Sequence, residues 1–235
     1  AETAAILNPE RTVLLTEAGA VCPLADMITA DELRELRARY PEAAVMCYVN
    51  SSAEVKAESY ISCTSVAVVE SIPHDEIIFV PDQNLGRYIS AQTQKQIILY
   101  PGFCYVHHRI KPEQVAMAKR LHPEAKVMVH PECRPEVTAM ADAVLSTSQM
   151  LHYAKASNQR SFIVGTEAGI LHGLRKQNPT KFFYLVSNGQ ICTDMKKTTL
   201  ETLAKTMELR QNVVTVPKEI RVRAKRAIDR MLAVG

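Results

Sequence analysis

The sequence predicts an α/β fold in which short parallel sheets are covered by helices. Apolar strands alternate with helices along the 235 residues, a pattern typical of parallel sheets. In addition, part of the chain repeats at an offset of 82 residues, since Cys22 recurs as Cys104 and Pro41–Met46 recurs as Pro123–Met128. A repeat of this kind predicts duplicated strand–helix units. Cys192 follows Cys104 by 88 residues and suggests a third copy.

The expected strands are short and mostly apolar. They span Arg11–Leu15, Ala44–Val49, Glu76–Val80, Gln96–Tyr100, Lys126–Val129, Ala143–Leu145, Ser161–Val164, Lys181–Val186 and Val213–Val216. Helix starts are marked by capping residues or by proline in the first turn. The expected helices begin near Thr29, Ser51, Arg87, Pro112, Pro135, Ile170, Thr198 and Pro217, and Ala1–Asn8 reads as the end of another.

The composition excludes several classes of protein. A net charge of +3, from 28 basic and 25 acidic side chains, is too balanced to indicate nucleic-acid binding. No apolar run approaches the length of a membrane span, and the start carries no signal-peptide pattern. Six cysteines spread among apolar strands do not resemble a secreted disulfide framework. We therefore expect a cytoplasmic protein that binds neither nucleic acid nor membrane.

Three cysteines stand at equivalent places in the repeat. Cys22, Cys104 and Cys192 each follow an apolar strand and precede a helix start. Ligands of parallel sheets lie at the carboxyl ends of strands, and helix N-termini favour anions, so we expect a small anion nearby. The chain has no CxxC pair of a zinc site, whereas three separated thiolates suit an iron–sulfur cluster with one open iron. Ordinary buried thiols are the alternative interpretation.

The other three cysteines are interpreted as packing thiols. Cys47, Cys63 and Cys133 sit in strand or turn contexts. Cys133 belongs to a His-Pro-Glu-Cys string that resembles a ligand motif, but its counterpart in the repeat is Ser51. It therefore breaks the pattern that unites the first three cysteines.

Several polar residues follow predicted strands. His130 stands opposite Tyr48 in the repeat, which favours a role in the site over a place in the core. His107 and His108 closely follow Cys104, and they either support the site or belong to a solvated loop. Glu167 either caps a helix or contacts a ligand.

Seven motifs are spread over nearly the whole chain. They are Thr3–Leu7, Tyr48–Ala57, Pro81–Gly86, Pro101–Cys104, His130–Glu136, Ser146–Met150 and Cys192–Lys196. Together they resemble the quinolinate synthase family. The resemblance implies condensation of iminoaspartate with dihydroxyacetone phosphate to quinolinate, with release of phosphate and water, in de novo NAD biosynthesis. It also implies a functional link to the enzyme that supplies iminoaspartate.

The resemblance implies a fold and a set of site residues. Three αβα domains would be related by pseudo-three-fold symmetry around a 4Fe–4S cluster at the inter-domain centre. The implied cluster ligands are Cys22, Cys104 and Cys192, which leave one iron open. The implied substrate-binding residues are Tyr48, Asn50, Ser65, His130, Glu132 and Thr147. Of these, Tyr48, His130 and Glu132 are implied to be catalytic.

The domain organisation follows from the same resemblance. Residues 1–24 are expected to be a remnant of the first unit, 25–107 the second unit, and 108–235 the third unit with C-terminal helices. The family has a further domain before the segment that matches Ala1, so we expect weak or absent turnover from this chain alone. The alternative is a catalytically impaired, truncated homologue that binds a cluster or a small anion without turnover.

Overall fold

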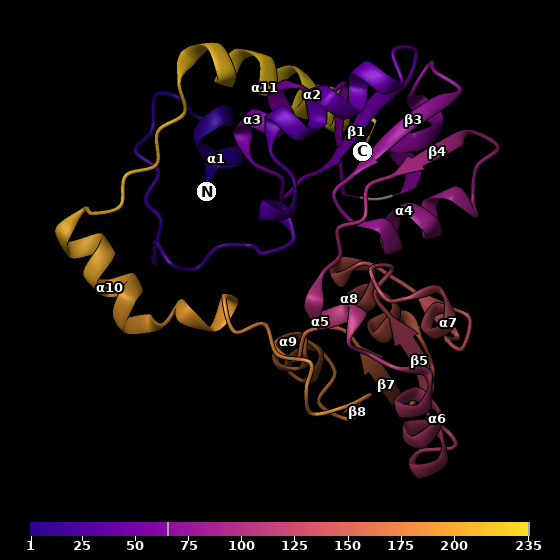
Figure 1. Ribbon diagram of the computed structural model, residues 1–235. Coiled ribbons are helices and arrows are strands. Elements are labelled where there is room, and N and C mark those ends of the chain that lie inside the picture. The colour runs from indigo at the N-terminus through magenta and orange to yellow at the C-terminus, as the bar shows by residue number, and fades with distance from the viewer. Residues whose placement is uncertain (65, 235) are drawn as a thin grey trace. The chain divides into compact units, whose positions relative to one another are not determined.

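The computed structural model describes residues 1–64 and 66–234, which form two compact units (Figure 1). Unit 1 comprises Ala1–Gly102 and the segment from Thr193 onward, and unit 2 comprises Phe103–Cys192. Each unit contains one four-stranded sheet, so the predicted α/β class is confirmed. Ser65, one of the predicted substrate-binding residues, lies outside the described residues.

The sheet of unit 1 is parallel throughout and has the strand order β2-β1-β3-β4. Its strands are β1 (Ala44–Tyr48), β2 (Ile61–Cys63), β3 (Glu76–Val80) and β4 (Gln96–Leu99). Both faces are buried, because Met46 and Phe79 belong to one core cluster and Val45 and Ile78 to another. This explains why the strands read as continuous apolar runs.

The helices of unit 1 include the C-terminal ones. They are α1 (Glu2–Leu7), α2 (Ala30–Arg39), α3 (Ala53–Ala57), α4 (Gln83–Ser90), α10 (Leu200–Leu209) and α11 (Lys218–Leu232), with 3₁₀ turns η1 (Ala25–Met27), η2 (Val66–Ser71) and η3 (Met195–Lys197). As predicted, α11 turns Ala224 and Ile228 inward, where they pack with Ile6 and Ala53. The sequence prediction grouped α11 with residues 108–235, whereas α11 packs on α3 and β2 of unit 1.

The sheet of unit 2 repeats that of unit 1. Its strands are β5 (Lys126–Val129), β6 (Ala143–Val144), β7 (Ser161–Gly165) and β8 (Phe182–Leu185), in the order β6-β5-β7-β8 and all parallel. The helices are α5 (Tyr105–His108), α6 (Pro112–Leu121), α7 (Pro135–Thr138), α8 (Thr147–Ala156) and α9 (Ile170–Gln177). Val127 and Met128 face opposite core clusters, so this sheet is also buried on both faces.

The structure confirms the internal repeat. The two sheets have the same strand order, and the ten-residue helices α2 and α6 are 82 residues apart. The ten-residue helix α10 extends the pattern, because α2, α6 and α10 each begin eight residues after Cys22, Cys104 and Cys192 respectively. The spacing between a cysteine and a ten-residue helix thus occurs a third time after Cys192. The pseudo-three-fold arrangement and the boundaries at residues 24 and 107 stay predictions.

Two predicted strands are wrong. Among the described residues, Arg11–Leu15 and Val213–Val216 contribute only an isolated antiparallel bridge between Leu14 and Val213. Val213 is 54% exposed, and among the described residues neither segment has a further strand pairing that would extend the ladder. An apolar run forms a strand in water only when a neighbouring strand and a buried face are both available.

Two helix starts lie one residue later than predicted. Ser52 caps α3 in place of Ser51, and Thr199 caps α10 in place of Thr198. Each capping oxygen accepts from the N–H group three residues further on. In both pairs the first residue is held in a preceding turn, and the second has the extended backbone that an N-cap requires. Among the described residues, no helix is both long and apolar enough to cross a bilayer.

The buried side chain of Lys56 in α3 makes the stability of the protein depend on pH. Its side chain is 1% exposed, and Nζ donates to the carbonyl oxygen of Ser51. Burial lowers the pKa of Lys56, so the unfolded chain binds this proton more tightly than the folded chain. The cost that Lys56 imposes on folding therefore falls as the pH rises towards its ordinary pKa of 10.5.

We expect the pH dependence of stability to change in a Lys56→Met variant. Urea unfolding of both proteins from about pH 7 to about pH 10 measures the difference in their free energies of unfolding. That difference should move in favour of the parent protein as the pH rises, because only the parent sheds the buried charge. A difference that stays constant over this range would show that Lys56 carries no such cost.

Candidate functional site

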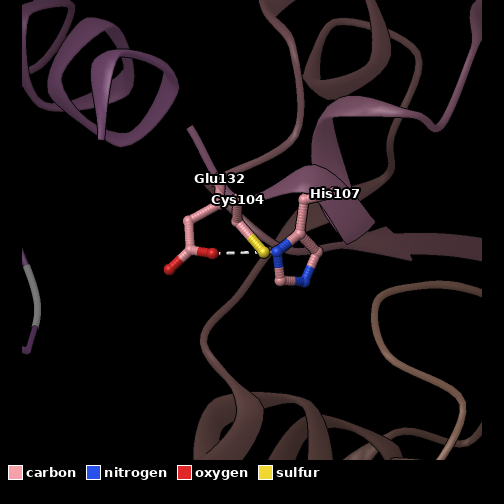
Figure 2. Close-up of side chains that lie close together, drawn as sticks. All are labelled: Cys104, His107 and Glu132. Atoms are coloured by element: carbon pink, nitrogen blue, oxygen red, sulfur yellow. Dashed lines mark hydrogen bonds and ion pairs between the residues drawn. The ribbon is translucent and has the colours of Figure 1, made fainter. Parts of the chain in front are cut away.

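The candidate site is built around Cys104 at the start of α5. Cys104 is the N-cap residue of this helix, and His107 follows one turn later on the same face. Glu132 comes from the loop after β5, at the carboxyl end of that strand. The Cys104 thiol, a ring nitrogen of His107 and a carboxylate oxygen of Glu132 all lie within 4.8 Å of one another (Figure 2). Thiolate, imidazole and carboxylate are all metal ligands, so this group could hold a metal ion.

His107 links Glu132 to a third element of unit 2. Its Nδ1 lies 2.8 Å from Glu132 Oε2, and its Nε2 lies 2.8 Å from Thr166 Oγ1, at the end of β7. The ring of His130 stacks on the His107 ring with centroids 4.4 Å apart and planes 13° apart. All four side chains are buried. Helix α5 and the loops after β5 and β7 therefore bring four buried polar side chains together at one end of the sheet.

Burial and pairing fix the charges in this group. Burial alone would lower the pKa of His107, but hydrogen bonds with Cys104 and Glu132 and the charge on Glu132 raise it to about 10. Burial and the charge on His107 lower the pKa of His130 to about 4. Burial would raise the pKa of Glu132, but the two histidines lower it. At neutral pH the group holds a His107–Glu132 ion pair beside a neutral His130.

The six cysteines fall into two classes. Cys47, Cys63 and Cys133 are buried in core clusters, as expected for packing thiols, and burial raises the pKa of Cys63 well above 9.0. Metal binding requires a thiolate, which such burial disfavours. The half-buried cysteines are Cys22, Cys104 and Cys192, the same three that the repeat singles out. Cys22 belongs to unit 1, and the other two belong to unit 2.

Glu167 supports the loop that carries Cys192. Its Oε2 accepts from the N–H of Gly169 at 2.6 Å, and its Oε1 accepts from the N–H of Cys192 at 3.3 Å. Glu167 thus shapes the turn before α9, although α9 itself has no side-chain cap. The same contact ties the Cys192 loop to the end of the sheet.

The remaining predicted residues lie at or beyond the carboxyl ends of strands in their own units. Tyr48 is the last residue of β1 and is half-buried, and Asn50 is exposed in the turn before α3. Both belong to unit 1. Thr147 is the exposed first residue of α8 in unit 2. Of the predicted site residues, unit 2 brings His130 and Glu132 together with Cys104.

The sequence leaves the role of His107 in the buried group undecided and does not identify Thr166. A histidine three residues after a cysteine lies on the same face only if a helical turn separates them. The one sequence feature that points to Thr166 is its position just after the predicted strand Ser161–Val164 and Gly165, where site residues are expected. Its partner, His107, is 59 residues away in the chain, a pairing that no local pattern indicates.

Residues 1–233 match the family profile described as "NadA: Quinolinate synthetase A protein". A quinolinate synthase of Dehalococcoides mccartyi is 57% identical over 237 residues, which cover 100% of this chain and 78% of that protein. Quinolinate synthase 1 of Methanosarcina acetivorans is 53% identical over 99% of this chain and 78% of its own length. A quinolinate synthase of Thermodesulfovibrio yellowstonii is 49% identical, with coverages of 100% and 78%.

Proposed function

Because the chain belongs to the quinolinate synthase family, we propose that Cys104, His130 and Glu132 form part of a quinolinate-forming active site. Membership of the family gives the protein an enzymatic role in NAD biosynthesis. Identity above one half along the whole chain does not favour the alternative of an impaired homologue. The observation that carries the proposal is the buried His–Glu–His group next to a half-buried thiol, at the carboxyl end of a parallel sheet.

The proposed substrates are iminoaspartate and dihydroxyacetone phosphate. Their condensation forms one C–C bond and one C–N bond and releases phosphate and water, so protons must be both removed and supplied. Glu132 is charged and can accept a proton. His130 is neutral, and its Nδ1 accepts from the N–H of Glu132 at 3.3 Å, so the ring N–H lies on Nε2 and can donate a hydrogen bond to a substrate oxygen. The pair thus offers a proton acceptor and a hydrogen-bond donor side by side.

The proposed cofactor is a 4Fe–4S cluster held by Cys22, Cys104 and Cys192. The donor set fits this group, because thiolates are the usual ligands of iron–sulfur clusters and these three thiols are the half-buried ones. When bound, a cluster with three protein ligands supplies one open iron as a Lewis acid. The His107 imidazolium beside Cys104 could donate a hydrogen bond to the ligating sulfur and so orient it.

The remaining substrate contacts are proposed from the resemblance and from position. Tyr48 and Asn50 offer a hydroxyl and an amide at the end of β1. Thr147 offers its hydroxyl at the N-terminus of α8, where backbone N–H groups favour a carboxylate or phosphate. Ser65 is proposed for the same role. A link to the enzyme that supplies iminoaspartate follows from the instability of such imines in water.

The test is anaerobic turnover by the purified protein. We expect quinolinate and phosphate to appear in equal amounts when freshly generated iminoaspartate and dihydroxyacetone phosphate are both present. Omission of either substrate should abolish both products. The proposal is contradicted if a folded protein that contains iron and sulfide releases phosphate without quinolinate, or forms neither product.

A further inference from the structure

We propose that His107 and Thr166 are positioning residues for proton transfer. Thr166 fixes the ring of His107, and His107 in turn holds the Glu132 carboxylate and the His130 ring. The inference rests on the proposed function for the roles of Glu132 and His130. It adds two residues that act through the side chains they contact, and not through direct contact with substrate.

The His107 ring is held at both of its nitrogens. Nδ1 is bonded to Glu132 Oε2 and Nε2 to Thr166 Oγ1, each at 2.8 Å. The ring cannot turn about its χ2 bond without breaking both bonds. Figure 2 shows that one Glu132 oxygen points towards His107, while the other points away from both His107 and Cys104. The bond therefore selects which carboxylate oxygen stays available for a proton.

The stacked rings transmit this restraint to His130. The centroids of His107 and His130 lie 4.4 Å apart with nearly parallel planes. His130 is 8% exposed, so its ring has little room to move away from its neighbour. A rotation of the His107 ring would therefore displace the His130 ring as well. The three side chains behave as one rigid group.

The sheet register places Thr166 where it can support this group. Val129 pairs with Gly165 in parallel register, so the next residues, His130 and Thr166, leave adjacent strands at the same edge. The backbone N–H of His130 donates to the Gly165 carbonyl at 3.0 Å. Gln190 Nε2 donates to the Thr166 carbonyl at 2.5 Å, which fixes the Thr166 backbone. The hydroxyl thus stands on a rigid element, as a positioning group requires.

The test removes the hydroxyl without changing the shape of the side chain. We expect Thr166→Val to lower kcat per iron by about 10-fold, with KM and iron content within about two-fold of the parent. Thr166→Ser restores the hydroxyl and should restore most of kcat. The matched control is Thr206→Val in unit 1, where a threonine that is 2% exposed donates to the Thr16 carbonyl at 2.9 Å. This control should leave kcat unchanged.

A second readout does not depend on turnover. Long-range ¹H–¹⁵N spectra of the histidine-labelled protein report the ring nitrogens of His107 and His130 directly. We expect Thr166→Val to shift the resonances of both rings, and Thr206→Val to shift neither. If the parent protein forms no quinolinate, the proposed function fails, and the spectra alone decide the positioning role.

Three outcomes would overturn the inference. The first is a Thr166→Val variant whose kcat and His130 resonances match the parent. The second is a fall in kcat that merely follows a loss of iron. The third is a fall of the same size in Thr206→Val, which would mark a general effect of removing a buried hydroxyl.

Discussion

Replacement of Cys104 by serine is expected to remove most of the iron and sulfide from the protein. The parent should hold about four iron ions per chain, and the variant less than about one. A hydroxyl is a far poorer ligand for iron than a thiolate, and Cys104 is the thiol that sits in the polar group with His107 and Glu132. Iron and acid-labile sulfide, measured after anaerobic purification, test this expectation.

The matched control is Cys133→Ala. Cys133 is 1% exposed, packs in the core of unit 2, and its Sγ donates weakly to the Gly165 carbonyl at 3.5 Å. Its loss should cost about 1 kcal/mol of stability through a small cavity, with the iron and sulfide retained. If Cys104→Ser keeps its full cluster content while Cys133→Ala loses it, the assignment of ligands from the repeat is wrong.

Replacement of Glu132 by glutamine is expected to lower kcat by about 10²–10⁴-fold, the usual effect of removing an acid or base. Glutamine keeps the shape of the side chain and can still bond to His107, but it cannot accept a proton at neutral pH. The iron content should stay near that of the parent. The measurement is kcat per iron, with a circular dichroism spectrum to verify the fold.

Glu136 provides the control for this charge change. It lies four residues further on, in the first turn of α7, and its side chain is exposed. Glu136→Gln removes the same negative charge from the same unit and should leave kcat within about two-fold of the parent. Equal losses in the two variants would mean that the net charge of unit 2, and not the Glu132 carboxylate, governs turnover.

Most of the correct fold prediction follows from the internal repeat. The offset of 82 residues relates α2 to α6 and β1 to β5, and the helix start capped by Thr29 lies where it was expected. By contrast, α4 begins at Gln83 behind its Asp82 cap, four residues before the expected start at Arg87. Local chemistry dictates these features. The placement of α11 depends instead on which apolar surface remains uncovered, namely that of α3 and β2, and a sequence pattern does not specify its partner.

The candidate site was predictable where the repeat marks it. His130 follows β5 as Tyr48 ends β1, and this correspondence drew attention to His130. The contacts around His130 were not predictable from the sequence. His107 bonds to Glu132, which is 25 residues away in the chain, and to Thr166, which is 59 residues away. Such contacts arise from sheet register and helix packing, which become known only when the chain is folded.

The central proposal is that Cys22, Cys104 and Cys192 together hold one 4Fe–4S cluster. The decisive measurement is iron and acid-labile sulfide per chain in the anaerobically purified protein, together with its visible spectrum. We predict about four iron ions and about four sulfide ions per chain, together with the broad visible absorption of an iron–sulfur cluster. Iron without sulfide would indicate a single metal ion at Cys104, His107 and Glu132, and near-zero values of both in a folded protein would contradict the cluster itself.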